Sequence, residues 1–420
     1  MLLILNKTLS RQVVNNQSNH LRVSLGISEY LLLIYVALIP IEDFFLKDLV
    51  SSSTRYVGGM LVLLYLFEKK LRLRWRLFPS AFYLFFGLLA LSIIFWADRP
   101  DYYVIVRLFF WMMTTVVVAD LSYKNPGILP RLFMVFSLTS VYLSIQVIIT
   151  FLQSRDLSRA TYMEMDQNGL AAILNTAIVF LFFINITRYK RDIVRKNITK
   201  AVSIVLALGV VSTGSRGGLI TIILAFLVYT ASITQKIRII LIATVLSVFF
   251  VFNYLDSDNK FFNLLDHRVE ESFQDKAGGR LPIWTIALQS FLDKPVFGHG
   301  YRNFRYEFRN YIGAAELDSD SESKLYSRRT LGTHNTYLEV LTEVGLLGLI
   351  LFVGFQIRLL RRLGKLNINQ LPKRLVLALF AVLFSYSFFI DASNQKLYWL
   401  LFGLIGGISF YYKGHPKDSI

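Results

Sequence analysis

Hydrophobic residues in this chain are grouped into long blocks, and short polar connections separate the blocks. A block of about 20 apolar residues is long enough for a helix to cross the hydrocarbon core of a membrane, which is roughly 30 Å thick. We interpret twelve blocks as membrane-spanning helices, at residues 28–46, 55–67, 78–97, 102–120, 130–152, 168–187, 199–214, 217–234, 237–255, 335–358, 373–391 and 396–412. The pattern predicts an all-α, polytopic integral membrane protein, because the alternating strands of an outer-membrane barrel are absent.

Positive charge is concentrated in alternate connections, and this distribution predicts the orientation of the chain. The basic runs lie at residues 68–76, 188–200, 235–238 and 358–374. Cytoplasmic loops carry an excess of Lys and Arg, so we expect both termini to be cytoplasmic. The net charge of +17 is then explained by topology and by contact with anionic membrane lipids, and no nucleic-acid partner is expected.

One connection on the opposite, external side is much longer than the others. It covers residues 256–333 and divides the chain into membrane helices one to nine (1–255), a large external loop (256–333) and membrane helices ten to twelve (334–420). A loop of this length without structure of its own is uncommon. We expect short helices within it, one that ends before Pro295 and one over residues 302–312.

Ionisable and amide side chains gather at the external ends of the predicted spans. Charged groups at membrane depth are costly and often functional, so we expect any chemistry on the external face. The residues are Glu42, Asp43, Arg107, Asp166, Asn168, Arg216, Arg280, His299, Arg302, Arg305, Arg309, His334, Asn335, Glu339, Glu343 and Asp391.

Two glycine-rich stretches with a single arginine are candidate phosphate sites. In STGSRGGL (212–219) and KAGGRLPIW (276–284), glycines flank Arg216 and Arg280 at the expected start of a helix. Glycine allows backbone N–H groups to converge on an anion, and a helix N-terminus favours negative charge. The alternatives are a tight turn with Arg216 reaching lipid headgroups and an ordinary solvated Arg280.

His334 lies directly before an apolar helix, in the stretch THNTYLEV. Thr336 and Glu339 match the S/T-x-x-E capping box, which places the helix start just after His334. An imidazole at this boundary suits proton transfer from a hydroxyl group. The alternative is a histidine at headgroup level without a chemical role.

Other classes of site have little support. The chain contains no cysteine, which excludes disulfides, thiolate metal sites and cysteine nucleophiles. No His, Asp or Glu cluster has clear metal-ligand spacing, and no Walker loop is present. The sequence predicts neither a metal site nor a cofactor.

Four stretches in this order resemble the O-antigen ligase and O-antigen polymerase superfamily of bacterial envelope glycosyltransferases. They are DQNGLAA (166–172), STGSRGGL (212–219), GGRLPIWTIALQSFLDKPVFGHG (278–300) and THNTYLEVLTEVGLLGLI (333–350). The resemblance is specific between residues 166 and 350 and only topological before them.

The resemblance implies a bacterial inner-membrane enzyme with a periplasmic active site. Such an enzyme transfers a glycan from undecaprenyl pyrophosphate to an acceptor hydroxyl, on lipid A–core or on another lipid-linked glycan, without metal or cofactor. Carried over by motif, Arg216 and Arg280 hold the pyrophosphate and His334 assists the hydroxyl. We further expect substrate contacts from Asp166, Asn168, Asn335, Arg302 and Arg305.

Three alternatives remain open from the residues alone. Ligase and polymerase differ only in the acceptor, and we favour the ligase. A transporter or flippase also suits twelve spans, although its polar groups are expected near the bilayer midplane. A third alternative is a different membrane glycosyltransferase with a carboxylate base at Glu42 or Asp43.

Overall fold

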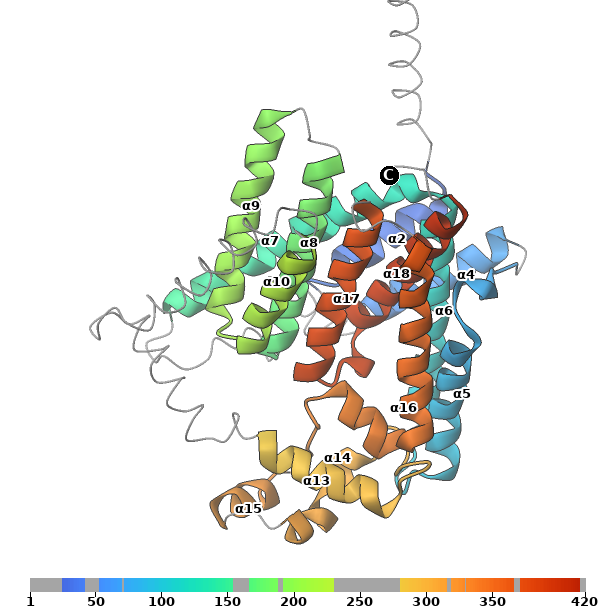
Figure 1. Ribbon diagram of the computed structural model, residues 1–420, viewed down its shortest axis with the longest axis vertical. Helices are drawn as coiled ribbons and strands as arrows, with labels where there is room; N and C mark the ends of the chain where they lie inside the picture. The colour runs from blue at the N-terminus through green and yellow to red at the C-terminus, as the bar shows by residue number, and fades with distance from the viewer. Residues whose placement is uncertain are drawn as a thin grey trace, which may run out of the picture.

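The computed structural model describes residues 25–41, 53–69, 72–153, 166–187, 192–229, 280–315, 319–328, 330–365 and 371–415, and these residues form helices and connections without strands. Figure 1 shows a helical bundle with a smaller helical layer, α13–α15, at one end. The bundle helices are α2 (Ile27–Leu38), α4 (Ser53–Glu68), α5 (Ser80–Phe95), α6 (Tyr102–Lys124), α7 (Leu129–Gln153), α8 (Gln167–Thr187), α9 (Ile193–Ser212), α10 (Arg216–Tyr229), α16 (Thr336–Arg362), α17 (Leu371–Phe389) and α18 (Lys396–Gly414).

The all-α prediction is confirmed within the described residues, where each predicted span coincides with a helix. The ninth predicted span, 237–255, lies outside the described residues, as do Glu42 and Asp43. Five helical stretches are long and apolar enough to cross a membrane: Tyr102–Lys124, Pro126–Gln153, Gln167–Asn185, Thr336–Arg362 and Pro372–Phe389. They indicate a multi-pass membrane protein, and the number of twelve spans stays a prediction.

Close approach between α18 and α6 builds the centre of the bundle. A Cβ atom on Gly403 would lie 2.8 Å from Val118, and one on Gly407 would lie 2.5 Å from the carbonyl oxygen of Ala119. Small residues let two membrane helices approach closely, and van der Waals contact then holds them together. The hydroxyl of Thr115 adds a hydrogen bond of 3.3 Å to the carbonyl of Trp399.

Helix α16 is broken at Gly345, where φ is 73° and ψ is −172°. The segment after α13 pairs with the backbone groups around the break. The N–H of Leu346 donates to Pro295 O (2.8 Å), and the N–H groups of His299 and Gly300 donate to Thr342 O (3.0 Å) and Glu343 O (2.8 Å). The exposed backbone of a broken helix is therefore satisfied by residues 295–300. Figure 1 shows the short first part of α16 lying across the end of the long second part.

The smaller layer has its own apolar core. It contains α13 (Arg280–Asp293), α14 (Phe304–Glu307), the 3₁₀ turn η3 (Phe308–Tyr311) and α15 (Ser319–Tyr326). Ile286, Phe304 and Phe308 are buried together between these elements. The predicted helix that ends before Pro295 is confirmed, and the second predicted helix is present as the short pair α14 and η3.

His299 joins the parts of this layer. Its Nε2 lies 2.8 Å from the carbonyl oxygen of Ser290, and its Nδ1 lies 2.6 Å from a carboxylate oxygen of Glu307. The ring is completely buried. Its two nitrogens link α13 to α14, so His299 supports the layer.

Candidate functional site

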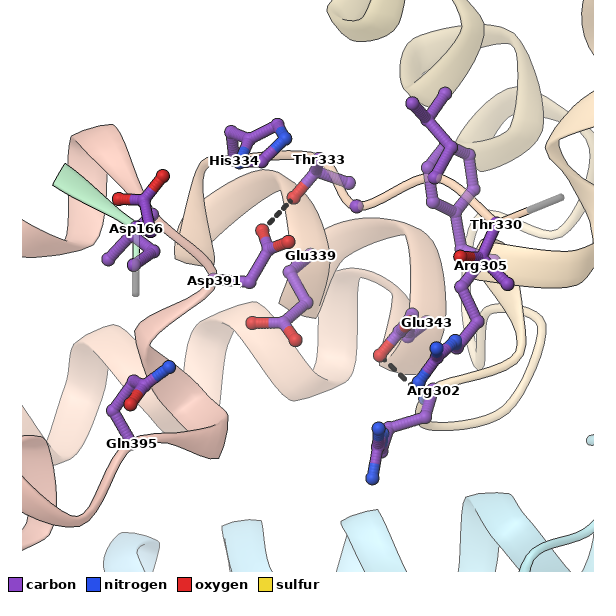
Figure 2. Close-up of a pocket in the computed structure, with 14 residues that line it drawn as sticks. Asp166, Arg302, Arg305, Thr330, Thr333, His334, Glu339, Glu343, Asp391 and Gln395 are labelled. Atoms are coloured by element: carbon purple, nitrogen blue, oxygen red, sulfur yellow. Dashed lines mark hydrogen bonds between the residues drawn. The ribbon is translucent and has the colours of Figure 1, made fainter. Parts of the chain in front are cut away.

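A polar cavity of about 320 Å³ opens between the bundle and the smaller layer. Its walls come from the start of α8, residues 302–305, the segment before α16, the first part of α16 and the connection between α17 and α18. The lining residues are Asp166, Arg302, Phe304, Arg305, Thr330, Leu331, Gly332, Thr333, His334, Glu339, Glu343, Ile390, Asp391 and Gln395. Figure 2 shows Asp166 on one side of this cavity, Arg302 and Arg305 on the other, and three carboxylates between them.

Each of the three central carboxylates is held by a hydrogen bond. Glu339 accepts from the hydroxyl of Ser393 at 2.8 Å, and Glu343 accepts from the backbone N–H of Arg302 at 2.7 Å. Asp391 accepts from Thr333 Oγ1 at 2.7 Å and from the N–H of Asn335 at 3.2 Å. These bonds fix the acids in position, which a catalytic group requires.

Asp391 and His334 lie close together in the lining of the cavity. Burial raises the pKa of the Asp391 carboxyl, and the nearby His334, with hydrogen bonds from Thr333 and Asn335, partly opposes that rise in pKa. A carboxylate beside an imidazole can stabilise the protonated ring. The pair is therefore suited to accepting a proton from a hydroxyl group.

The backbone at His334 presents this side chain at the cavity wall. His334 has a φ of 50°, a left-handed conformation that is uncommon for residues other than glycine. Helix α16 begins at Thr336, as predicted, but its N-cap is Asn335, whose side-chain oxygen accepts from the N–H groups of Tyr337 (2.9 Å) and Leu338 (3.2 Å). The predicted capping box with Thr336 and Glu339 is wrong, because Glu339 binds Ser393 instead.

Arg302 and Arg305 bring positive charge to the same cavity. Arg302 also has a left-handed backbone, with φ of 66°, two residues after Gly300, whose N–H group donates to the backbone beside the break in α16. The break thus positions an arginine and the carboxylate Glu343 at one point. The cavity combines hydrogen-bonded acids, an imidazole and guanidinium groups.

Two predicted site residues meet at a different point, the carbonyl oxygen of Phe389 at the end of α17. Arg280 Nη2 donates to this oxygen at 3.2 Å, and Asn168 Nδ2 donates at 3.3 Å. Ser215, the neighbour of Arg216, donates its hydroxyl to Asn168 Oδ1 at 2.6 Å. The three motifs thus converge beside the cavity, within two residues of Asp391, although none of the three arginine or asparagine side chains lines it.

The glycines around Arg216 are explained by packing. A Cβ atom on Gly217 would lie 2.5 Å from the ring of Phe389, and one on Gly218 would lie 2.4 Å from Ala171. The N–H of Gly218 donates to the Ser215 hydroxyl at 2.9 Å, so it is engaged within the helix start. Arg216 itself is exposed at the first residue of α10.

Asp166 has two roles in the structure. It lines the cavity, and its carboxylate accepts from the N–H groups of Asn168 (2.8 Å) and Gly169 (3.2 Å) at the start of α8. A carboxylate at a helix N-terminus caps the free N–H groups and is favoured by the helix dipole. Asp166, His334, Arg302 and Arg305 are therefore brought to one cavity.

Comparison with known proteins connects this geometry to a family. The match is to the family described as O-antigen ligase. Residues 201–353 carry it. A Rickettsia conorii protein provisionally named a polysaccharide ligase is 28% identical over 95 residues. These residues are 22% of this chain, and the chain spans 22% of the length of that relative. The resemblance to O-antigen ligases found from the sequence motifs is confirmed over this region.

The O-antigen ligase region contains Arg216, Arg280 and His334, with Glu339 and Glu343. Asp166 and Asp391 lie outside it and complete the cavity from α8 and from the end of α17. From the sequence, Asn335, Glu339 and Glu343 are expected on one helix face because they are four residues apart, and Asp391 is expected only as a polar residue at a boundary.

Proposed function

We propose that the chain is a membrane glycosyltransferase of the O-antigen ligase type. The observation that carries this proposal is the polar cavity in which His334 lies beside Asp391, with Arg302 and Arg305 on the opposite wall. The family match over residues 201–353 gives the class of reaction. The proposed donor is a glycan on undecaprenyl pyrophosphate, and the proposed acceptor is a hydroxyl group of lipid A–core.

The proposed reaction is a direct displacement. The acceptor hydroxyl oxygen forms a bond to the anomeric carbon while the bond from this carbon to the pyrophosphate oxygen breaks. The electron pair leaves with the pyrophosphate, and the hydroxyl proton passes to His334. Asp391 stabilises the resulting imidazolium through its negative charge. Hydrogen-bonded groups that are fixed before the reaction stabilise developing charge most efficiently.

Arg280 and Arg216 are the proposed groups for the pyrophosphate. Guanidinium groups bind phosphate oxygens in a planar, bidentate manner. Arg280 is held at the end of α17 by the Phe389 carbonyl, and Arg216 is exposed at the start of α10, which packs on the same residue. Both lie on the α8 and α10 side, so the donor is proposed to enter from there. The chemistry needs no metal in this scheme.

The proposed location is the bacterial inner membrane, with both termini in the cytoplasm and the cavity on the periplasmic side. The basic connections support this orientation. The polymerase alternative uses the same donor and cavity with a lipid-linked glycan as the acceptor. A transporter is less well supported, because the polar groups described here gather at one end of the bundle.

The test is the surface glycan of a strain that lacks this gene and is complemented with defined variants. Loss of the gene should leave lipid A–core without O-chain, and the wild-type gene should restore the O-chain. His334→Ala and Asp391→Ala should insert into the membrane and fail to restore it. Arg72→Gln, an exposed arginine distant from the cavity, is the matched control and should complement fully.

The pattern on a gel separates the alternatives. Lipid A–core that carries single repeats would indicate a polymerase in place of a ligase. Unchanged lipopolysaccharide in the deletion strain would contradict both and favour another glycan or the transporter. Full complementation by His334→Ala would remove the imidazole from the mechanism.

A further inference from the structure

A second cavity, of about 570 Å³, lies among α2, α4, α6 and the start of α18, and the reaction scheme above makes no use of it. Its walls are mainly apolar and include Leu63, Val106, Phe110 and Trp111. Several of these side chains are exposed, with Leu63 at 53% and Val106 at 54%. In a membrane, an apolar surface of this kind meets lipid chains.

Positive charge is confined to one end of this second cavity. Arg55, Arg107 and Lys396 line it, and among the lining residues that the structure describes none is acidic. These residues lie in the first two turns of α4, α6 and α18, near the N-termini of the three helices. Helix N-termini carry partial positive charge and favour anions. The apolar lining residues Leu63, Phe110 and Trp111 lie further along α4 and α6.

This division matches the chemistry of an amphiphile with an anionic headgroup. Guanidinium and ammonium groups bind phosphate by charge-assisted hydrogen bonds. Apolar walls bind hydrocarbon chains by packing. A lipid with a phosphate at its head would place that phosphate among the cations and its chains along Phe110 and Trp111.

The two cavities adjoin. Gln395 lines the polar cavity, and the next residue, Lys396, lines the apolar one. The guanidinium of Arg107 lies within electrostatic reach of Arg302, which lines the polar cavity. Figure 2 shows Arg302 across the polar cavity from Asp166, with Gln395 on the Asp166 side.

We propose that the cavity among α2, α4 and α6 binds the lipid part of the acceptor, a phosphate-bearing glycolipid, with its phosphate at Arg55, Arg107 and Lys396. The sugar of the acceptor then extends past Arg302 to His334. The inference rests on the proposed glycosyl transfer and assigns separate sites to its two lipid-borne substrates.

The test measures the two substrates separately, with the full-length protein in phosphatidylcholine nanodiscs that contain no competing anionic lipid. In the double variant Arg55→Gln/Arg107→Gln, the apparent KM for the acceptor should rise about tenfold while the KM for the donor stays within about twofold. Arg72→Gln removes one positive charge at an exposed site outside the cavity, and it should leave the KM values of donor and acceptor unchanged.

A second variant tests the apolar part without changing charge. A Cβ atom on Gly59 would lie 3.7 Å from Phe110, at ordinary contact distance, so Gly59→Leu places a side chain in the cavity without a backbone clash. It should also raise the acceptor KM and spare the donor KM. Gel filtration and the donor KM establish that each variant is folded.

Direct binding separates this inference from the proposed function. The probes are lipid A and its dephosphorylated form, each measured by native mass spectrometry on the full chain. Lipid A should bind at least tenfold more tightly than the dephosphorylated form, and the double variant should lose this preference. If the wild type binds lipid A in this way but transfers nothing, the proposed function fails and the lipid site stands.

Three results would overturn the inference. The first is an increase of the donor KM in place of the acceptor KM, which would assign the cavity to the donor lipid. The second is an unchanged acceptor KM in both variants. The third is displacement of lipid A by an equal concentration of phosphatidylglycerol, which would make the cavity a general site for anionic phospholipids.

Discussion

The break in α16 should depend on Gly345, and Gly345→Ala is expected to loosen the docking of residues 295–300. The backbone of Gly345, with φ of 73° and ψ of −172°, is one that only glycine adopts readily. An added Cβ atom would also lie 2.2 Å from the carbonyl oxygen of Val296, which is backbone and cannot turn away.

The size of the local destabilisation in Gly345→Ala follows from these contacts. Holding a non-glycine residue in this conformation costs about 1–3 kcal/mol. Relief of the clash would separate the two segments, and each backbone group left buried without a partner costs about 1–3 kcal/mol more. A local loss of about 3 kcal/mol corresponds to an increase of roughly 100-fold in the open population.

Amide hydrogen exchange measures this population directly, because exchange of a protected amide requires opening. The amides of His299, Gly300 and Leu346 donate across the junction and should exchange about 100-fold faster in Gly345→Ala. Transfer activity should fall as well, since Arg302 follows this segment by two residues and lines the polar cavity. The control is Gly354→Ala, in the same helix, where an added Cβ meets no atom within 4 Å.

Equal exchange at these three amides in both variants would refute this reasoning. It would mean that residues 295–300 are held without the bend at Gly345. Faster exchange throughout the bundle in Gly345→Ala would also contradict the argument, because it predicts a local effect. Gly354→Ala should leave the junction unchanged and stabilise α16 slightly, since alanine favours helix more than glycine.

The remaining predictions concern single groups and metal. Burial raises the folded-state pKa of Asp391, so its contribution to stability is full below the unfolded pKa of about 3.9 and is lost as the pH rises through the higher folded pKa. Asp391→Asn should remove this loss of stability with rising pH. A free energy of unfolding that falls equally with pH in the wild type and in Asp391→Asn would contradict the prediction. Asn168→Ala removes the bonds to Ser215 and Phe389 and should lower the free energy of unfolding by about 1–3 kcal/mol, measured by thermal denaturation, whereas an unchanged midpoint would deny the link. EDTA should leave transfer unaffected, and inhibition that Mg²⁺ reverses would contradict a metal-free reaction.

The sequence predicts the helices well, because apolar length and polar boundaries carry the signal. Predicted spans beginning at residues 102 and 396 correspond to α6 and α18, which begin at Tyr102 and Lys396. It does not predict the break at Gly345, since glycine is frequent in unbroken membrane helices. The break depends on its pairing with residues 295–300, which lie in a distant part of the chain.

The candidate site was predicted in part for a similar reason. Side chains placed at the external boundary by sequence, such as His334, Asp166 and Arg302, do meet in one cavity. The motifs do not show that Arg280 and Asn168 bind the Phe389 carbonyl, because these residues come from segments more than 100 residues apart. Nor do they show the partners of Glu339 and Asp391, which depend on how α16 packs against the connection between α17 and α18.

The bend in α16 also determines how deep its acids lie. Along a straight helix each residue advances about 1.5 Å, so Glu343, seven residues after Thr336, would lie about 10 Å closer to the bilayer centre. Because the part before Gly345 lies across the end of the long second part (Figure 1), Glu339 and Glu343, which belong to this first part, do not follow the axis of the second part. The bend thus gathers a row of acids at one end of the bundle, on the same helix whose longer part contributes to a stretch apolar enough to cross a membrane.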